Sequence, residues 1–125
     1  MTKNNISSHF GPRSSPGGIG SSYHQGLDIA FPEGTKVLAC ESGTVTIAGW
    51  YSGYGLCIII DHGKGVQTIY AHLSKVNAKK GQMVVRGQYI GNVGSTGNST
   101  GPHLHLGVKH NGSYVNPEKG WLCIH

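Results

Sequence analysis

Glycine is the feature that most limits what this chain can fold into. Glycine fills 21 of the 125 positions, and no long window carries the 3.6-residue apolar period of a helix without a glycine or a proline. Glycine weakens helices but suits tight turns, because it tolerates positive φ angles. The sequence therefore favours short strands joined by turns over packed helices.

Apolar segments of strand length follow one another in the middle of the chain. The expected strands cover residues 35–39, 43–48, 56–60, 66–72, 82–85, 88–93 and 104–110. Glycine-containing turns separate them, and residues 61–65 are the expected turn of a hairpin. The polar, Gly/Ser/Pro-rich first 23 residues are expected to form a loop. We predict an all-β sandwich or partly open barrel of roughly seven to nine strands.

Length and charge exclude several classes of protein. The length suits one domain, so a single domain over residues 1–125 is expected. The net charge of +5 favours anionic partners, but the basic residues are scattered and no RNA-reading aromatic cluster accompanies them, so nucleic-acid binding is not expected. No apolar run is long enough to span a membrane. The first residues lack the apolar core of a signal peptide.

The three cysteines do not form a recognisable site. Cys40, Cys57 and Cys123 contain no C-x-x-C pair, so neither a thiolate zinc knuckle nor a thioredoxin-like site is supported. Cys57 lies in an apolar segment and is expected to be a small buried side chain. A disulfide between Cys40 and Cys123 stays open.

Histidine must supply most of any acid–base or metal chemistry, because eight histidines stand beside only five carboxylates. His103 and His105 alternate with leucines, which places both imidazoles on one face of a strand about 6.7 Å apart. They can address one metal-sized site, or one can bind a metal while the other faces a substrate. Two solvated histidines on an exposed face are the alternative.

A second pair is His24 and Asp28. An imidazole and a carboxylate are suitable zinc ligands. On a straight strand they would lie about 13 Å apart, too far to share an ion, but Gly26 allows a bend. The alternative is a turn histidine followed by a capping aspartate.

A third candidate is His72, at the end of an expected strand. By strict alternation it shares a face with Thr68 and Tyr70, which would turn it inward or toward a cleft. A structural role for His72 is the alternative. A structural role is expected even more strongly for His62, which lies in the turn.

The candidates are more specific together than singly. A catalytic zinc site keeps three protein ligands and an open position for water. His24, Asp28 and one of His103 and His105 would supply two imidazoles and a carboxylate. His72 and the other histidine would then serve proton transfer. The chain lacks H-E-x-x-H, so it is not a helix-based zincin.

These motifs resemble those of the lysostaphin-type zinc endopeptidases, which cut bacterial cell-wall peptides. His24 and Asp28 match H-x-x-x-D, His72 matches A-H-L, and residues 103–105 match H-L-H. Segments 6–11, 26–30 and 94–102 match as well. The resemblance covers about residues 6–118, which would be the core of the domain.

The resemblance implies a two-sheet β fold with a central groove and one Zn²⁺ per chain held by His24, Asp28 and His105. His72 and His103 would lie beside the metal, where one helps to deprotonate the attacking water and both stabilise the tetrahedral intermediate. Which of them is the base stays open.

Two further features of the family transfer less directly. The oxyanion-stabilising tyrosine of some members has no clear counterpart, so Tyr23 and Tyr54 are only candidates for substrate binding. The Gly-rich residues 94–101 lack the ending of a phosphate-binding P-loop and are expected to form a flexible wall of the groove.

The implied function is hydrolysis of peptide bonds in peptidoglycan stem peptides or cross-bridges, with a bond containing a D-amino acid favoured. Such a protein would be a monomer that acts outside the cell or facing the cell wall, and it could be bacterial or phage-borne. One alternative is a non-catalytic peptidoglycan-binding or regulatory module of the same fold. A histidine phosphotransfer domain is another, although it has no use for Asp28 as a ligand.

Overall fold

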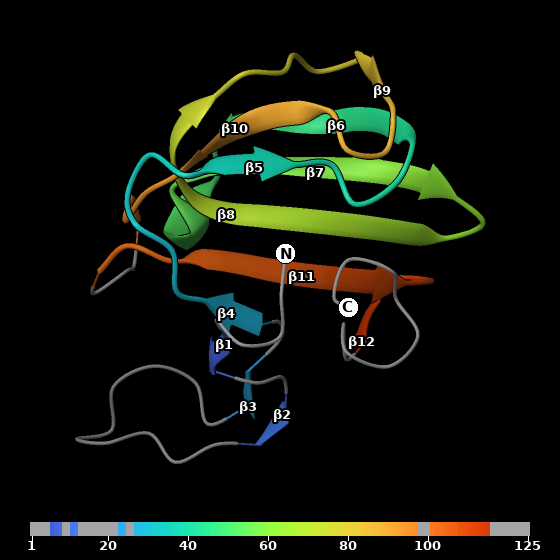
Figure 1. Ribbon diagram of the computed structural model, residues 1–125. Helices are drawn as coiled ribbons and strands as arrows, with labels where there is room; N and C mark the ends of the chain where they lie inside the picture. The colour runs from blue at the N-terminus through green and yellow to red at the C-terminus, as the bar shows by residue number, and fades with distance from the viewer. Residues whose placement is uncertain (1–5, 9–10, 13–22, 25–26, 98–100, 116–125) are drawn as a thin grey trace.

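The computed structural model describes residues 6–8, 11–12, 23–24, 27–97 and 101–115, with side chains from residue 28 onward. These residues form twelve strands (Figure 1). They are β1 (Ile6–Ser8), β2 (Gly11–Pro12), β3 (Tyr23–His24), β4 (Leu27–Ile29), β5 (Lys36–Leu38), β6 (Gly43–Trp50), β7 (Leu56–Gly63), β8 (Val66–Val76), β9 (Met83–Val84), β10 (Tyr89–Val93), β11 (Leu104–His110) and β12 (Ser113–Val115). In this part of the chain the only helical turn is the 3-10 helix η3 (Ser52–Tyr54).

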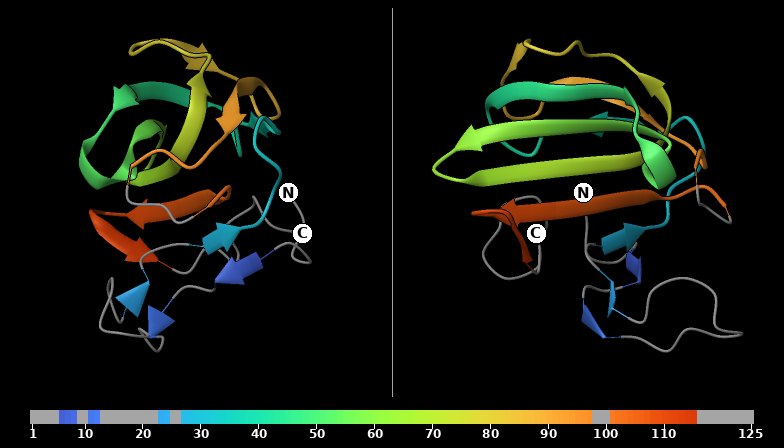
Figure 2. Two further views of the ribbon diagram at one scale, coloured as in Figure 1. Left: turned by 90° about the vertical axis from the view of Figure 1, so that its left-hand side faces the viewer. Right: turned by 180° about the vertical axis from the view of Figure 1, so that it is seen from behind.

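The prediction of an all-β fold is confirmed. Ten strands form one sheet in which β1, β4, β11, β8, β7, β6 and β9 follow in that order, while β2 and β3 form a separate pair. The pairings are antiparallel. The sheet curls, so that β5 and β10 lie across from β6 and β7 (Figure 2). No helix in the described residues is long and apolar enough to cross a membrane.

Strand β8 is the centre of the sheet and changes neighbours along its length. Residues 66–71 pair with β11 on one side, whereas Leu73 and the residues after it pair with β10. β7 pairs with β8 on the other side. The change of partner from β11 to β10 falls at His72.

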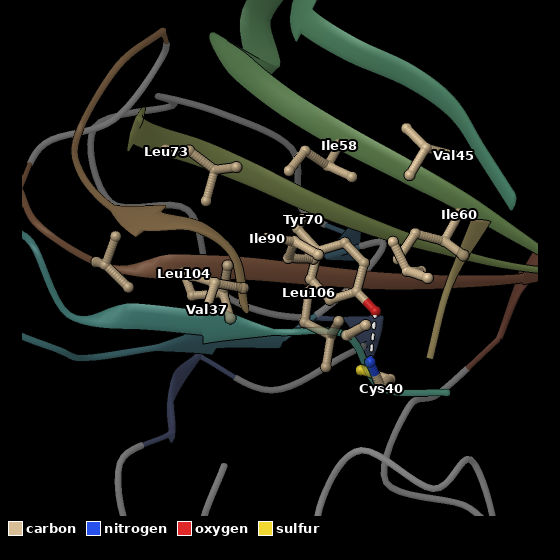
Figure 3. Close-up of a cluster of buried hydrophobic side chains, with 13 residues drawn as sticks. Val37, Cys40, Val45, Ile58, Ile60, Tyr70, Leu73, Ile90, Leu104 and Leu106 are labelled. Atoms are coloured by element: carbon tan, nitrogen blue, oxygen red, sulfur yellow. Dashed lines mark hydrogen bonds between the residues drawn. The ribbon is translucent and has the colours of Figure 1, made fainter. Parts of the chain in front are cut away.

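The core lies inside the curl of the sheet (Figure 3). Side chains of β5 and β10, such as Val37 and Ile90, meet those of β7, β8 and β11. Tyr70 is fully buried there, and its hydroxyl accepts a hydrogen bond of 2.9 Å from the backbone N–H of Cys40. Burial raises the pKa of Tyr70 to about 12. Its hydroxyl is therefore a neutral structural group.

Two hairpins use the same tight turn. Lys64 and Gly65 have φ angles of 53° and 78°, and Asn111 and Gly112 have 52° and 83°. Two consecutive positive φ angles define the type I′ turn, whose twist matches that of the flanking strands. The first hairpin was predicted, but β12 was not, although Asn-Gly is the strongest short hairpin signal in a sequence.

The expectation that the first 23 residues form a loop is wrong for β1, β2 and the start of β3. Ile6 pairs with Ile29, and Pro12 pairs with Tyr23. These strands have two or three residues each, so their own sequence carries too little periodicity to mark them. Backbone pairing with distant partners decides them instead.

The cysteines differ in state. Cys57 is a free thiol with no solvent exposure, as predicted, and burial raises its pKa to about 12. Cys40 is disulfide-bonded. Cys123 lies outside the described residues.

Candidate metal and catalytic site

Asp28 and His105 meet because they are direct partners across two strands. β4 and β11 pair in the register that sets His105 opposite Asp28, where side chains on one face are close neighbours. Nδ1 of His105 lies 2.9 Å from Oδ1 of Asp28. The predicted alternation of β11 holds, since Leu104 and Leu106 are buried in the core on the opposite face from His105.

His103 approaches the same carboxylate oxygen from the other side. Its Nε2 lies 3.6 Å from Oδ1 of Asp28, and its Nδ1 lies 2.9 Å from the carbonyl oxygen of Gly101. A carbonyl only accepts hydrogen bonds, so Nδ1 of His103 carries a proton. One oxygen of Asp28 therefore has imidazole nitrogens of both His103 and His105 nearby.

His72 reaches the cluster through a bulge in β8. The expectation that it shares a face with Thr68 and Tyr70 is wrong. Between two aligned pairs, Leu56 with Leu73 and Ile58 with Tyr70, β8 contains one residue more than β7. Tyr70 and Leu73 consequently both face the core, although they are three residues apart. His72 has a φ of 60°, a left-handed conformation uncommon outside glycine. The bulge turns His72 out of the core and toward the other histidines.

Ring distances define the resulting cluster. The centroid of His72 lies 5.2 Å from that of His103 and 5.9 Å from that of His105. His72 and His105 are each 7% exposed. Three imidazoles and one carboxylate therefore share a small, largely buried region at one face of β11.

Thr96 holds His72 in this orientation. Nδ1 of His72 donates to the carbonyl oxygen of Thr96 over 2.7 Å. The hydroxyl of Thr96 donates to the carbonyl of Leu73 at 2.6 Å and accepts from the N–H of Leu56 at 3.0 Å. This part of the Gly-rich loop is thus tied to two strands, which differs from the flexible wall that we expected. Sequence reasoning missed Thr96, and only its place in the matched segment 94–102 could have pointed to it.

The surroundings favour the neutral form of His72. Burial lowers its pKa below the usual value of 6.5, and the nearby His105 and His103 lower it further. The hydrogen bond to Thr96 and the charge of Asp28 act in the opposite direction but do not outweigh burial. Neutral His72 carries its proton on Nδ1 and leaves the Nε2 lone pair available to accept a proton.

The other predicted residues are placed less completely. The backbone of His24 pairs with Gly11 in β3, and Tyr23 pairs with Pro12. Their side chains lie outside the description, so the predictions for both stay predictions. β3 and β4 belong to different sheets, so His24 and Asp28 do not share one strand. His62 is structural as expected, with ring nitrogens 2.8 Å from the Ser42 carbonyl and 2.7 Å from the Thr68 hydroxyl.

Tyr54 lies at the site. Its ring stacks on the imidazole of His105, with centroids 5.7 Å apart and planes inclined by 28°. It comes from η3, which follows β6 in the chain. Tyr54 is therefore the one of the two candidate tyrosines whose side chain contacts the cluster in the described structure.

The donor set fits zinc as far as it is described. Zinc takes imidazole nitrogen and carboxylate oxygen at about 2.0–2.2 Å, so two tetrahedral ligand atoms lie about 3.4 Å apart. Oδ1 of Asp28 and Nδ1 of His105, which belong to two of the three expected ligands, lie 2.9 Å apart, near that spacing. No group of three or more His, Cys, Asp or Glu in the described residues is arranged to hold a metal ion. The third expected ligand, the His24 side chain, is not among them.

The sequence matches a family of peptidases and several named proteins. Residues 22–117 match the model of peptidase family M23. The DD-carboxypeptidase/endopeptidase Mpg of Neisseria meningitidis is 48% identical over 112 residues, which is 90% of this chain. The murein hydrolase activator EnvC of Escherichia coli is 38% identical over 98 residues, or 78% of the chain. The chain spans only 26% and 23% of the length of these relatives.

Solved structures agree with the sequence matches. A zinc-containing peptidase from Vibrio cholerae superposes with a TM-score of 0.85 at 38% identity, covering 92% of this chain and 36% of that one. The catalytic domain of lysostaphin from Staphylococcus simulans superposes with a TM-score of 0.82 at 38% identity, covering 90% of this chain and 88% of that one. The family match, the shared fold and the histidine–aspartate cluster lead to one conclusion: this chain belongs to peptidase family M23.

Proposed function

We propose that this chain is a zinc-dependent endopeptidase that hydrolyses a peptide bond in the stem peptides or cross-bridges of bacterial peptidoglycan. Asp28 carries the proposal, because its Oδ1 lies 2.9 Å from Nδ1 of His105 and 3.6 Å from Nε2 of His103 while the ring of His72 lies beside both rings. An arrangement of this kind combines ligands of zinc with imidazoles able to transfer protons.

The roles of the residues follow from their atoms. His24, Asp28 and His105 would hold the metal. Zinc bound there would polarise the scissile carbonyl and lower the pKa of a water molecule. Nε2 of either His72 or His103 would accept a proton from the attacking water, and both rings would stabilise the developing negative charge. The hydrogen bonds of their Nδ1 atoms to backbone carbonyls keep both lone pairs in place.

The substrate class rests on the relatives and on charge. The name of the Neisseria relative specifies DD-bonds, which supports a bond that contains D-amino acids. The net charge of +5 suits approach to an anionic wall. The same reasoning supports action outside the cell or facing the cell wall. The match of residues 22–117 to one family model supports a single peptidase domain with its core at about residues 6–118.

Digestion of purified peptidoglycan tests the proposal. We expect the zinc-loaded chain to release fragments whose masses correspond to one added water per cut bond, and a chelator to stop this release. Asp28→Ala and His105→Ala should bind less zinc and release nothing, whereas His72→Ala should bind zinc and still release nothing. His110→Ala, on the exposed end of β11, is the matched control. A chain that holds one zinc and cuts no bond would overturn the proposal.

A non-catalytic role is the second candidate, because the EnvC relative is named as an activator. A regulatory module would bind peptidoglycan or a partner hydrolase without cutting. In that case the digestion stays negative, while adding the chain to a separate hydrolase increases fragment release. The Asp28 cluster argues for the enzyme, since an activator needs no ligand set.

A further inference from the structure

Tyr54 and Tyr114 form a pair beside His105. Tyr54 lies in η3 and Tyr114 in β12, 60 residues further along the chain, and their hydroxyl oxygens are 2.5 Å apart. The ring of Tyr54 stacks on His105. The hydroxyl of Tyr114 is therefore connected to the imidazole of His105 through one intervening side chain.

Tyr114 lies on β12, which is paired with β11, the strand that carries His105. β12 pairs with β11, where Tyr114 is opposite Lys109. The ammonium of Lys109 lies 4.8 Å from the centre of the Tyr114 ring, a favourable cation–π contact. A Cβ atom on Gly107 would lie 3.3 Å from Tyr114 Cε1, so the absence of a side chain at this position leaves room for the ring.

Tyr54 depends more on its neighbours. η3 is a single turn on the surface, next to Tyr51, which is 44% exposed. The backbone bond from Tyr51 to Gly55 closes the turn, but it does not fix the direction of the Tyr54 ring. The hydroxyl bond to Tyr114 supplies this second point of attachment, because a ring held at its hydroxyl end cannot turn away from His105.

We propose that Tyr114 is a positioning residue, which holds the ring of Tyr54 against His105 and so keeps Nδ1 of His105 directed at Asp28. Its effect on catalysis rests on the proposed function, whereas its effect on the His105 ring does not. Groups that orient metal ligands from the second layer commonly change metal affinity or activity by about 10–100-fold when removed.

NMR of the full metal-free chain tests the positioning directly. The stacked Tyr54 ring shields the carbon-bound ring protons of His105, whose signals are assigned by their loss in His105→Gln. We expect Tyr114→Phe and Tyr54→Phe each to move these signals, and the double variant to match either single one because both remove the same bond. Tyr89→Phe removes a tyrosine hydroxyl bonded to Asn92 and serves as the control. Unchanged His105 signals in folded Tyr114→Phe would overturn the proposal.

Kinetics and metal affinity test the consequence. On a soluble cross-linked stem peptide, Tyr114→Phe should lower kcat about 10-fold with KM changed less than about twofold, and should weaken zinc binding by a similar factor against a competing chelator. Wild-type values of both in a variant with shifted His105 signals would overturn the positioning role. If the wild-type chain cuts no peptide, the proposed function fails, but the NMR result still decides the positioning of His105.

Discussion

The Nδ1 atom of His72 lies 2.7 Å from the carbonyl oxygen of Thr96, 24 residues further along the chain. This contact joins the bulge of β8 to the loop that precedes β11. A left-handed conformation such as that of His72, with a φ of 60°, costs on the order of 1–3 kcal/mol and persists only where neighbouring contacts enforce it. Thr96 is the neighbour that does so.

Removing the Thr96 hydroxyl should therefore loosen both strands that it joins. In Thr96→Val the N–H of Leu56 and the carbonyl of Leu73 lose a shared partner. We expect the free energy of unfolding to fall by about 1–3 kcal/mol, as measured by urea denaturation. Thr96→Ser keeps the hydroxyl and should recover most of this loss. An unchanged free energy of unfolding in Thr96→Val would show that the hydroxyl contributes little.

The lowered pKa of His72 should make stability fall as the solution becomes more acidic. The unfolded chain takes up a proton on His72 near pH 6.5, whereas the folded chain does so only at lower pH because burial lowers its pKa. The contribution of neutral His72 to the free energy of unfolding is therefore fully present above about pH 6.5. It declines as the pH drops toward the pKa of His72 in the folded chain. In the metal-free protein, His72→Gln should reduce this decline between pH 7.5 and the folded pKa.

Ser74→Ala is the control for that experiment, because it removes the hydrogen bond to Val93 near the bulge without removing a titratable group. It should keep the wild-type pH slope of the unfolding free energy. A wild-type slope in His72→Gln would contradict the assignment of the effect to His72.

Gly55 and Gly81 differ in steric contact and in backbone conformation, because Gly55 also has a ψ of −140°, a combination that favours glycine. Both have positive φ angles, 65° and 89°, but a Cβ on Gly55 would lie 2.5 Å from the carbonyl carbon of Thr96, while a Cβ on Gly81 meets nothing within 4 Å. Alanine at Gly81 should cost about 1–2 kcal/mol through the left-handed backbone alone. Alanine at Gly55 should cost about 1–3 kcal/mol more. Equal unfolding free energies for the two variants would refute the close approach of η3 to Thr96.

The buried hydroxyl of Tyr70 should stabilise the core. It accepts a hydrogen bond of 2.9 Å from the Cys40 N–H and one of 2.8 Å from the Thr68 hydroxyl. Tyr70→Phe takes away both partners in a region closed to water, so a loss of about 1–3 kcal/mol in unfolding free energy is expected. Tyr89→Phe, at a partly exposed position, should lose about 0.5 kcal/mol or less. A similar small loss for Tyr70→Phe would mean that the network contributes little.

The sequence by itself determined the fold class, the longer strands and the chemistry of the site. Alternation in residues 103–108 put His103 and His105 on the face opposite the leucines, and glycine-rich turns argued against a helical fold. These features are local, because side-chain periodicity and turn conformation depend on a few neighbouring residues. The residue counts indicated that histidine supplies most of the acid–base or metal chemistry. Asp28 was selected by its spacing from His24 and by the family motif.

The tertiary structure decided which of these residues meet and how they are held. The register of β4 on β11 sets Asp28 against His105, and the bulge in β8 reverses the face expected for His72. The bond from His72 to Thr96 and the bond between Tyr54 and Tyr114 span 24 and 60 residues. Register, bulges and contacts of this kind arise when distant strands pair and share one core, so no local pattern records them.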